Sequence, residues 1–572
     1  MEYSAIFHDM DKRFCYAIDK DLFVIRVQVK KDDMKEVILH YEDKYIPMER
    51  KDTRMTLPMK KVATSQFHDY YEAQLRMNLI CLRYFFEFTD MQGEKVYYGN
   101  YEFDKECITN RDRMFDCPQN LREEEMFEVP QWAANKVVYQ IFPSRFAATQ
   151  PVDKKLWYKA PITPMDDLHG NLRGIIEHLD YIKDLGIDVV YLTPIFKSNS
   201  CHKYDTIDYY QVDPSFGTTE DLKELVQKSH ERGMKVVLDA VYNHSGREFF
   251  AFQDILEKGE KSKYLDWYFI DELPPRGEWG EIPNFKCFGY YGGMPKLNLK
   301  NPEVEKYITD VACYWIKECD IDGWRLDVGD EISHFFWKNF RKAIKAVKKD
   351  MLIIGEIWHY AGDFLEGDEW DTVMNYPFYL NLIDLLADEK INVSQFVQNL
   401  GYLKGRLNKK CYPLMWNLID SHDTARFLHL CNDNKKKQHL AAAFQLLLPG
   451  MPMVYYGDEY AMPGANDPDC RRGMYWDEEY QDKEMFEWYK RLLQVRKAHT
   501  CIVEGELAEA ITRDEDETIV LIRKNGEETI ALIFNCSDHM KEFKEYAQKQ
   551  DLLTEKAFDG KVEAFDAAVI VF

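Results

Sequence analysis

Eight short apolar runs alternate with amphipathic stretches between residues 135 and 500, and this alternation limits the possible folds more than any other feature of the sequence. Apolar runs separated by helical periodicity are typical of β–α units around a parallel sheet. Eight such units in succession predict a (β/α)8 TIM barrel. The runs are KVVYQIFP (136–143), IDVVYLTP (187–194), KVVLDAVYNH (235–244), IDGWRLDV (321–328), MLIIGEIW (351–358), TVMNYP (372–377), PLMWNLIDSHD (413–423) and MPMVYYGDEY (451–460).

The stretches between the runs carry helix signals. We expect helices over residues 172–186, 218–233 and 302–318. In the last of these, Asn301 suits the cap position and Pro302 the first turn. The gap between the third and fourth strands is long and rich in aromatic residues, Gly and Pro, so we expect an inserted subdomain at about residues 245–300.

Strand patterns occupy both flanks of the predicted barrel. We expect an N-terminal β-sandwich over residues 1–125, the barrel over 126–500, and a C-terminal β-sandwich over 501–572. An acidic stretch at 122–130 suggests a linker, and an Asn-Gly pair in 518–534 predicts a hairpin. The N-terminal strands are expected at LFVIRVQV (22–29), EVILHY (36–41), LRYFFEF (82–88) and VYYGNYEF (96–103).

Charge and cysteine usage exclude several classes of function. The formal net charge is −25, which argues against nucleic acid or an anionic membrane as a partner, because both bind basic surfaces. Thirteen cysteines without CxxC spacing fit neither a disulfide framework nor a zinc site, and suggest reduced thiols. The N-terminus lacks a signal-peptide core and no run is apolar enough to cross a membrane. We therefore expect a cytoplasmic protein.

Polar side chains follow several of the predicted strands. The third strand ends with Asp239, Asn243 and His244, the fourth carries Arg325 and Asp327, the fifth Glu356, and the seventh His422 and Asp423. Active sites of these barrels lie at the C-terminal ends of the strands. We expect these residues to meet at one rim, although any one of them alone could form a structural ion pair there.

Arg325 and Asp327 stand two positions apart, so a strand directs both to one face. The guanidinium favours an ionised Asp327. Glu356 is framed by apolar neighbours, and we expect it in a drier, less cationic setting that favours its protonated form. One ionised and one protonated carboxyl group facing one site suit glycoside hydrolysis.

Four segments resemble the motifs of glycoside hydrolase family 13, the α-amylase family: DAVYNH (239–244), GWRLDV (323–328), GEIW (355–358) and SHD (421–423). MPKLN (294–298) is similar to the motif of its cyclomaltodextrinase, neopullulanase and maltogenic amylase group. The resemblance implies a retaining hydrolase of α-1,4 bonds in α-glucan oligosaccharides, including cyclodextrins, pullulan and maltooligosaccharides. It also implies an N-terminal domain of carbohydrate-binding or dimerisation type, and hence a homodimer.

The resemblance also implies roles for individual residues. Asp327 would be the nucleophile, Glu356 the acid/base, and Asp423 the group that binds sugar hydroxyls and stabilises the transition state. The remaining substrate-binding residues are His244, Arg325 and His422 around the glucose unit beside the cleaved bond, Tyr204 beneath it, and Trp358 and Glu331 on the acceptor side. The retaining mechanism predicts carboxyl groups about 5–5.5 Å apart.

No cofactor or metal is expected. The stretch 145–157 contains one carboxylate, Asp153, where many relatives have a calcium loop, and calcium needs six or more oxygen ligands. Asn243 could ligate a calcium of another kind, but we expect a structural hydrogen bond there. Asp330 and Asp420 depart from the family pattern, and either could change the balance between water and sugar as acceptor.

Three alternatives remain open. A transglycosylase would use the same residues with a sugar hydroxyl in place of water. A catalytically silent glucan-binding protein would be expected to lack the three carboxylates. An α-1,6-glucosidase or a sucrose-active enzyme is less favoured because of MPKLN.

Overall fold

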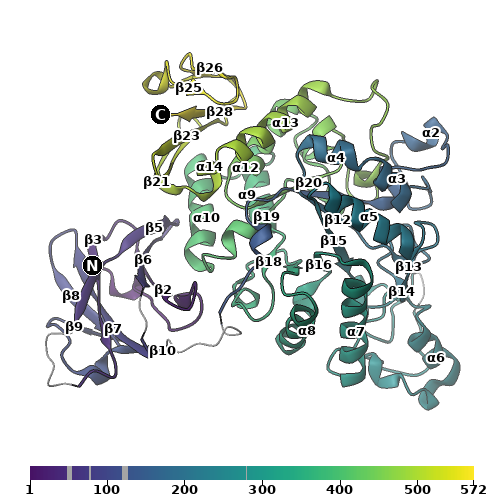
Figure 1. Cartoon of the computed structure of the whole chain (residues 1–572), viewed down its shortest axis with the longest axis horizontal. Helices are drawn as coiled ribbons and strands as arrows, with labels where there is room; N and C mark the ends of the chain where they lie inside the picture. Colours follow the sequence, from purple (N-terminus) through teal and green to yellow (C-terminus); the bar gives the residue numbers. More distant parts are fainter. Residues whose placement is uncertain (48–53, 77–78, 119–125, 278–279) are drawn as a thin grey trace. The chain divides into compact units, whose positions relative to one another are not determined.

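The computed structural model describes residues 1–47, 54–76, 79–118, 126–277 and 280–572 (Figure 1). It divides into two compact units. The first comprises residues 1–128, 361–368 and 391–412, and the second comprises residues 129–360, 369–390 and 413–572. Part of the acidic stretch at 122–130 lies outside the described residues.

The first unit is an antiparallel β-sandwich. One sheet has the order β1-β2-β6-β5, and the other the order β4-β3-β7-β8-β9 with β10 beside β7. Apolar side chains of both sheets fill the space between them, among them Val27, Leu39 and Phe86. The strands are β1 (Cys15–Ala17), β2 (Leu22–Lys30), β3 (Met34–Asp43), β4 (Met55–Pro58), β5 (Lys60–Thr64), β6 (His68–Arg76), β7 (Cys81–Asp90), β8 (Lys95–Gly99), β9 (Glu102–Asp104) and β10 (Phe115–Pro118).

The single strand predicted over 96–103 is wrong. The chain turns back at Asn100 and Tyr101, which have φ of 46° and 65°, and β8 then pairs with β9. Positive φ ends a strand, and Asn accepts it more readily than most residues.

Helix α10 (Val393–Arg406) belongs to the first unit although it lies between barrel strands in sequence. Its Gly401 and Gly405 face the sandwich closely: a Cβ atom at Gly401 would lie 1.9 Å from the Thr64 carbonyl oxygen. Arg26 donates to the Gly405 carbonyl oxygen at 2.8 Å and pairs with Glu72. These contacts are long-range, so periodicity alone did not indicate them.

The second unit contains the predicted barrel. All eight strands run parallel, in the order β18-β17-β16-β15-β12-β11-β20-β19. The Asn375 N–H donates to the Trp416 carbonyl oxygen at 2.8 Å, which closes the ring between β18 and β19. The strands are β11 (Val138–Ile141), β12 (Val189–Leu192), β15 (Lys235–Ala240), β16 (Gly323–Leu326), β17 (Leu352–Gly355), β18 (Thr372–Val373), β19 (Trp416–Asn417) and β20 (Met451–Tyr455).

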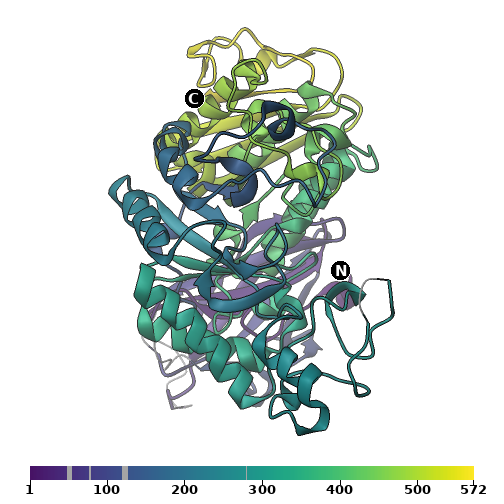
Figure 2. The same ribbon diagram turned by 90° about the vertical axis from the view of Figure 1, so that its right-hand side faces the viewer.

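Helices surround these strands (Figures 1 and 2). The Asn301 side chain caps α7 and Pro302 is its first residue, as predicted. The helices are α3 (Leu172–Glu177), α4 (Leu179–Leu185), α5 (Thr219–Glu231), α7 (Pro302–Cys319), α8 (His334–Val347), α9 (Tyr376–Leu386), α12 (Lys435–Leu447) and α13 (Lys483–Ala498), with the shorter α1 (Pro143–Phe146), α2 (Lys154–Trp157), α11 (Phe427–Leu430) and α14 (Cys501–Glu504).

Two excursions leave the strand ends. The hairpin of β13 (Phe196–Ser198) and β14 (Thr206–Val212) follows the second barrel strand, and its loop carries Tyr204. The expected insertion after the third strand contains α6 (Phe250–Lys258) and several isolated β-bridges, one of which pairs His244 with Lys296.

The C-terminal part is an uneven sandwich. A six-stranded sheet, β21-β22-β23-β28-β25-β26, packs with a two-stranded sheet, β24-β27, around Ile533, Phe543 and Val562. The predicted hairpin joins β22 and β23, with Gly526 at φ 60° in the turn. The strands are β21 (Glu506–Arg513), β22 (Thr518–Asn525), β23 (Glu528–Asn535), β24 (Lys541–Glu542), β25 (Gln550–Asp551), β26 (Lys556–Ala557), β27 (Lys561–Val562) and β28 (Asp566–Val571).

Within the described ranges, no helix combines the length and the apolar character needed to cross a membrane.

Asp322, at the N-terminal end of β16, is a buried carboxylate that should stabilise the barrel. It pairs with His230 at 2.6 Å, Lys235 at 2.9 Å and Lys348 at 3.1 Å. Burial acts to raise its pKa, but these partners and the Val236 N–H lower the pKa to about 2. A lowered pKa in the folded state means that the stabilisation is complete above the unfolded pKa of about 4 and is lost as pH falls toward 2.

We therefore expect Asp322→Asn to lower the free energy of unfolding by about 2 kcal/mol at pH 7. The thermal midpoint measured at pH 7 and at pH 3 checks this, and the difference from wild type should shrink at the lower pH. Asp320→Asn is the matched control, because Asp320 also contacts Lys348 but its side chain is 70% exposed. A thermal midpoint that Asp322→Asn leaves unchanged would contradict the stabilising role of Asp322.

Candidate active site

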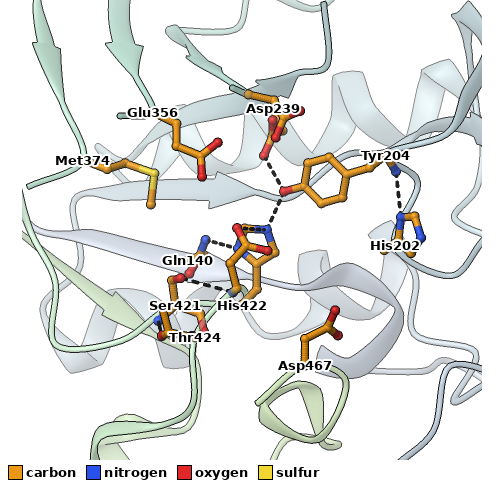
Figure 3. A network of polar contacts seen from close by, with 12 residues as sticks. Gln140, His202, Tyr204, Asp239, Glu356, Met374, Ser421, His422, Thr424 and Asp467 are labelled. Carbon is orange, nitrogen blue, oxygen red and sulfur yellow. Dashed lines mark hydrogen bonds and ion pairs between the residues drawn. The ribbon is translucent and has the colours of Figure 1, made fainter. Parts of the chain in front are cut away.

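The sequence-predicted residues meet at the C-terminal ends of the barrel strands. In the strand register, Asp239 of β15 lies beside Arg325 of β16, and Arg325 lies beside Ile354 of β17. These residues therefore lie at the same height along the barrel axis. Glu356 follows β17 directly. Figure 3 shows Glu356 and Asp239 facing the same space as Tyr204 and His422.

Arg325 is the centre of this cluster. Its Nη1 lies 3.0 Å from Asp239 Oδ1 and 3.0 Å from Asp327 Oδ1. Its Nη2 lies 2.8 Å from Glu356 Oε2 and 3.9 Å from Asp423 Oδ2. One fully buried guanidinium thus contacts four carboxyl groups that come from four strands.

The expectation that Glu356 has a less cationic setting is wrong. Glu356 contacts the same guanidinium as Asp327, because the fork of Arg325 reaches both residues. The apolar neighbours in sequence, Ile354 and Ile357, are buried and do not keep the cation away. The sequence could not reveal this contact, since it depends on which side chains cross the barrel opening.

Burial raises the pKa of Asp239, Asp327 and Glu356, with Arg325 acting in the opposite direction. For Asp327 the guanidinium favours the ionised form, as expected, but burial outweighs it and the pKa is raised. Three buried carboxyl groups share the single Arg325 guanidinium, which does not offset the cost of burying their charges.

Asp423 behaves differently. Burial acts to raise its pKa, but His422, Arg471 and Arg325 lower it. Its Oδ1 accepts from Arg471 at 3.2 Å, and its side chain is the most open of the four carboxylates, at 28% exposed. Asp423 therefore stays ionised at the rim of the cluster.

The individual oxygens of Asp327 and Glu356 have distinct surroundings. Asp327 Oδ1 is held by Arg325, whereas its buried Oδ2 has no hydrogen-bond partner among the described residues. Glu356 Oε2 accepts from the Val328 N–H at 3.0 Å and lies against Arg325, while Oε1 accepts only a longer bond of 3.3 Å from Trp358. Oδ2 is free to bind another atom, and Oε1 is the oxygen better placed to carry a proton.

A directed chain of hydrogen bonds orders His422 and Tyr204 (Figure 3). The Gln140 amide donates to His422 Nδ1 at 2.8 Å, and burial lowers the His422 pKa to about 3. The neutral ring therefore carries its proton on Nε2, which bonds the Tyr204 hydroxyl. That hydroxyl donates to Asp239 at 3.2 Å. Tyr204 and His422 also stack with an interplanar angle of 6°.

His244 is buried beside the cluster. Its ring stacks on Phe288 with centroids 5.1 Å apart, and its Nε2 has no hydrogen-bond partner among the described residues. Burial lowers its pKa to about 3, so the ring is neutral. A buried ring nitrogen without a partner is expected to bind a ligand group.

The two residues predicted on the acceptor side lie at the edge of the cluster. Trp358 is 42% exposed and stacks on Tyr376 with centroids 3.9 Å apart. Glu331 is exposed, and its Oε2 accepts from the Asn243 amide at 3.0 Å. The side-chain Oδ1 of Asn243 accepts from Lys296 Nζ, which is a structural hydrogen bond of the kind expected at this residue.

The two residues that depart from the family pattern occupy different places. Asp330 is exposed and lies 4.0 Å from His359. Asp420 is buried and accepts the Phe427 N–H at 2.7 Å, in a group that includes Asp458.

Sequence reasoning missed several polar residues of the site. Arg471 donates to the His422 carbonyl oxygen at 2.8 Å and pairs with Asp467 at 2.7 Å, and Tyr191 donates to Asp239 at 2.6 Å. Tyr191 and Gln140 lie within apolar runs, so their inward direction could have been read from strand alternation. Asp467 and Arg471 lie after β20, in a segment whose single 3-10 turn, Asp469–Arg471, is too short for a period to give their direction.

In the part of the chain that the structure describes, no group of three or more His, Cys, Asp or Glu side chains is arranged to hold a metal ion.

Comparisons with known proteins identify a family and several similar proteins. The family model described as the α-amylase catalytic domain matches residues 140–505, and the α-amylase N-terminal Ig-like domain matches residues 1–119. A cyclomaltodextrinase from Geobacillus thermopakistaniensis is 42% identical over 95% of this chain and 92% of its own length. An intracellular maltogenic amylase from Bacillus subtilis is 38% identical over 94% and 91%. A solved cyclomaltodextrinase structure superposes with a TM-score of 0.93 at 37% identity, covering 100% of both chains.

Proposed function

This chain belongs to the α-amylase family of glycoside hydrolases, and we propose on that premise that it cleaves α-1,4 bonds of cyclodextrins, pullulan and maltooligosaccharides with retention of configuration. The gathering of Asp327, Glu356 and Asp423 around Arg325 carries the proposal. The names of the similar proteins, cyclomaltodextrinase and maltogenic amylase, support the substrate class.

In the first step, Asp327 Oδ2 attacks the anomeric carbon while Glu356 gives a proton from Oε1 to the glycosidic oxygen. The bond between that carbon and oxygen breaks, and the acceptor-side sugar leaves with a hydroxyl group. A covalent ester of Asp327 forms with inverted configuration. The unpartnered Oδ2 of Asp327 suits the attack. Burial raises the pKa of both carboxyl groups, and the mechanism requires the proton on Glu356 with Asp327 ionised.

In the second step, water gives a proton to the Glu356 carboxylate and attacks the same carbon, which releases Asp327 and inverts the configuration again. Two inversions give net retention. The carboxyl separation of about 5–5.5 Å stays a prediction of this mechanism.

The remaining site residues bind the sugar beside the cleaved bond. Ionised Asp423 accepts hydrogen bonds from sugar hydroxyls, and neutral His244 contributes its unpartnered Nε2. Neutral His422 lies beside the same sugar, with Nε2 shared with Tyr204. Arg325 holds the carboxylates in place, and Tyr204 offers its ring face to the glucose unit. On the acceptor side, the exposed ring of Trp358 stacks against the next sugar and Glu331 bonds its hydroxyls.

A product time course on β-cyclodextrin, pullulan and soluble starch tests the proposal. We expect ring opening of the cyclodextrin followed by maltose and glucose, panose from pullulan, and slower attack on starch. Products longer than the substrate would show that sugar hydroxyls compete with water, as in a transglycosylase, and the exposed Trp358 is the feature that favours such an acceptor. No cleavage of any of the three would favour a glucan-binding protein.

We propose that catalysis needs no metal ion. The side-chain Oδ1 of Asn243, which could otherwise ligate calcium, accepts from the Lys296 ammonium group. Dialysis against EDTA should therefore leave the rate on β-cyclodextrin unchanged, and a loss that calcium restores would contradict this.

We further propose a cytoplasmic homodimer. The thirteen cysteines, among which the described residues show no disulfide, and the intracellular relative support a reducing compartment. The dimer rests on the resemblance of the N-terminal domain, and a monomer mass in light scattering would count against it.

A further inference from the structure

The segment MPKLN pairs with the end of the third barrel strand. The Leu297 N–H donates to the Asn243 carbonyl oxygen at 3.0 Å, and the Ser245 N–H donates to the Pro295 carbonyl oxygen at 3.1 Å. These backbone bonds place Lys296 opposite His244. The position of the Lys296 side chain is therefore set by main-chain pairing.

The Lys296 ammonium group links two elements of the site. Its Nζ donates to the side-chain Oδ1 of Asn243 and to the backbone carbonyl oxygen of Glu331, the latter at 3.2 Å. The Asn243 amide in turn donates to Glu331 Oε2 at 3.0 Å. Burial lowers the Lys296 pKa to about 8, with Glu331 opposing, so the group is charged at neutral pH. Lys296 thus holds the end of the turn that follows the fourth strand.

That turn also determines the position of Glu356. It begins at Val328, whose φ of 47° is a left-handed conformation that a β-branched residue rarely adopts. Such a conformation persists only where surrounding contacts hold it. In this conformation the Val328 N–H donates to Glu356 Oε2 at 3.0 Å. The start of the turn therefore positions one oxygen of Glu356, and the end of the turn is held by Lys296.

We propose that Lys296 is a positioning residue for proton donation: by holding the turn 328–331 at Glu331, it keeps the Val328 N–H on Glu356 Oε2 and so directs Oε1 toward the glycosidic oxygen. This inference rests on the proposed role of Glu356. On this proposal, Lys296 influences the reaction through Glu356 and does not itself contact the reacting atoms.

The test compares two substrates that differ in their need for a proton. The value of kcat/KM is measured for β-cyclodextrin, whose leaving oxygen must be protonated, and for α-maltosyl fluoride, whose leaving group needs little help. We expect Lys296→Met to lower kcat/KM about tenfold on cyclodextrin and less than about twofold on the fluoride. Lys296→Arg should restore part of the difference because it returns a cation. Lys300→Met, at an exposed position two residues after the segment, is the matched control.

Equal losses on the two substrates, or no loss on either, would overturn the inference, because a general structural role affects both substrates alike. If Lys296→Met does not fold, Lys296→Gln is judged by the same ratio. A wild-type protein inactive on both substrates would overturn the proposed function and this inference with it. An active wild type with equal losses in the variant overturns the inference alone.

Discussion

Asp327→Asn should lower kcat on β-cyclodextrin by about 10⁴-fold or more while the protein remains folded. The amide has nearly the same shape as the carboxylate but cannot form the ester with the anomeric carbon. It also leaves the buried Arg325 with one anionic partner fewer among four. The rate is measured with thermal unfolding as the check on folding.

Asp330→Asn is the matched control for this variant, because Asp330 is an exposed carboxylate three residues later in the same turn. We expect its rate to stay within a few-fold of wild type. A fluorinated maltosyl fluoride that slows the second step should label the wild-type protein, and peptide mapping should locate the label on Asp327. More than a hundredth of the wild-type rate in Asp327→Asn, or a label elsewhere, would rule out this nucleophile.

Glu356→Gln should show a loss that depends on the leaving group. On β-cyclodextrin we expect kcat/KM to fall about 10³-fold, because the amide cannot donate a proton to the glycosidic oxygen. On α-maltosyl fluoride the fall should be much smaller. Added azide should raise kcat of the variant and give α-maltosyl azide, because a small anion can attack the Asp327 ester without a general base.

Glu331→Gln is the control for the azide experiment, because Glu331 lies nearby but bonds Asn243 and not the proposed reacting atoms. Its rate should not respond to azide. Equal losses of Glu356→Gln on both substrates, or a β-configured azide product, would contradict the acid/base role.

Much of the fold could be predicted from the sequence because its causes are local. The apolar runs have strand length and the stretches between them have helical periodicity, so the barrel follows from the chain order. Asn301 and Pro302 begin α7 for reasons contained in three or four residues. The break between β8 and β9 was missed because positive φ at Asn100 and Tyr101 leaves little trace in an apolar pattern.

The sequence was enough to predict which residues come together in the candidate site. Strand alternation and the rule that strand ends meet at one rim were enough to bring Asp239, Arg325, Asp327, Glu356 and Asp423 together. The same reasoning failed for the electrostatic setting of Glu356. A pKa depends on the side chains that pack across the barrel opening, and Arg325 reaches Glu356 from a neighbouring strand.

By itself, the sequence determined the order of the strands, the rim on which the polar residues lie, and the family to which the chain belongs. Only the tertiary structure decided that Arg325 contacts four carboxyl groups and that Arg471 approaches Asp423. It also decided that α10 belongs to the first unit and that Lys296 links Asn243 to the turn 328–331. The reason is physical. Periodicity and capping act over a few neighbouring residues, whereas charge pairing and burial depend on residues that are distant in sequence and meet only when the chain has folded.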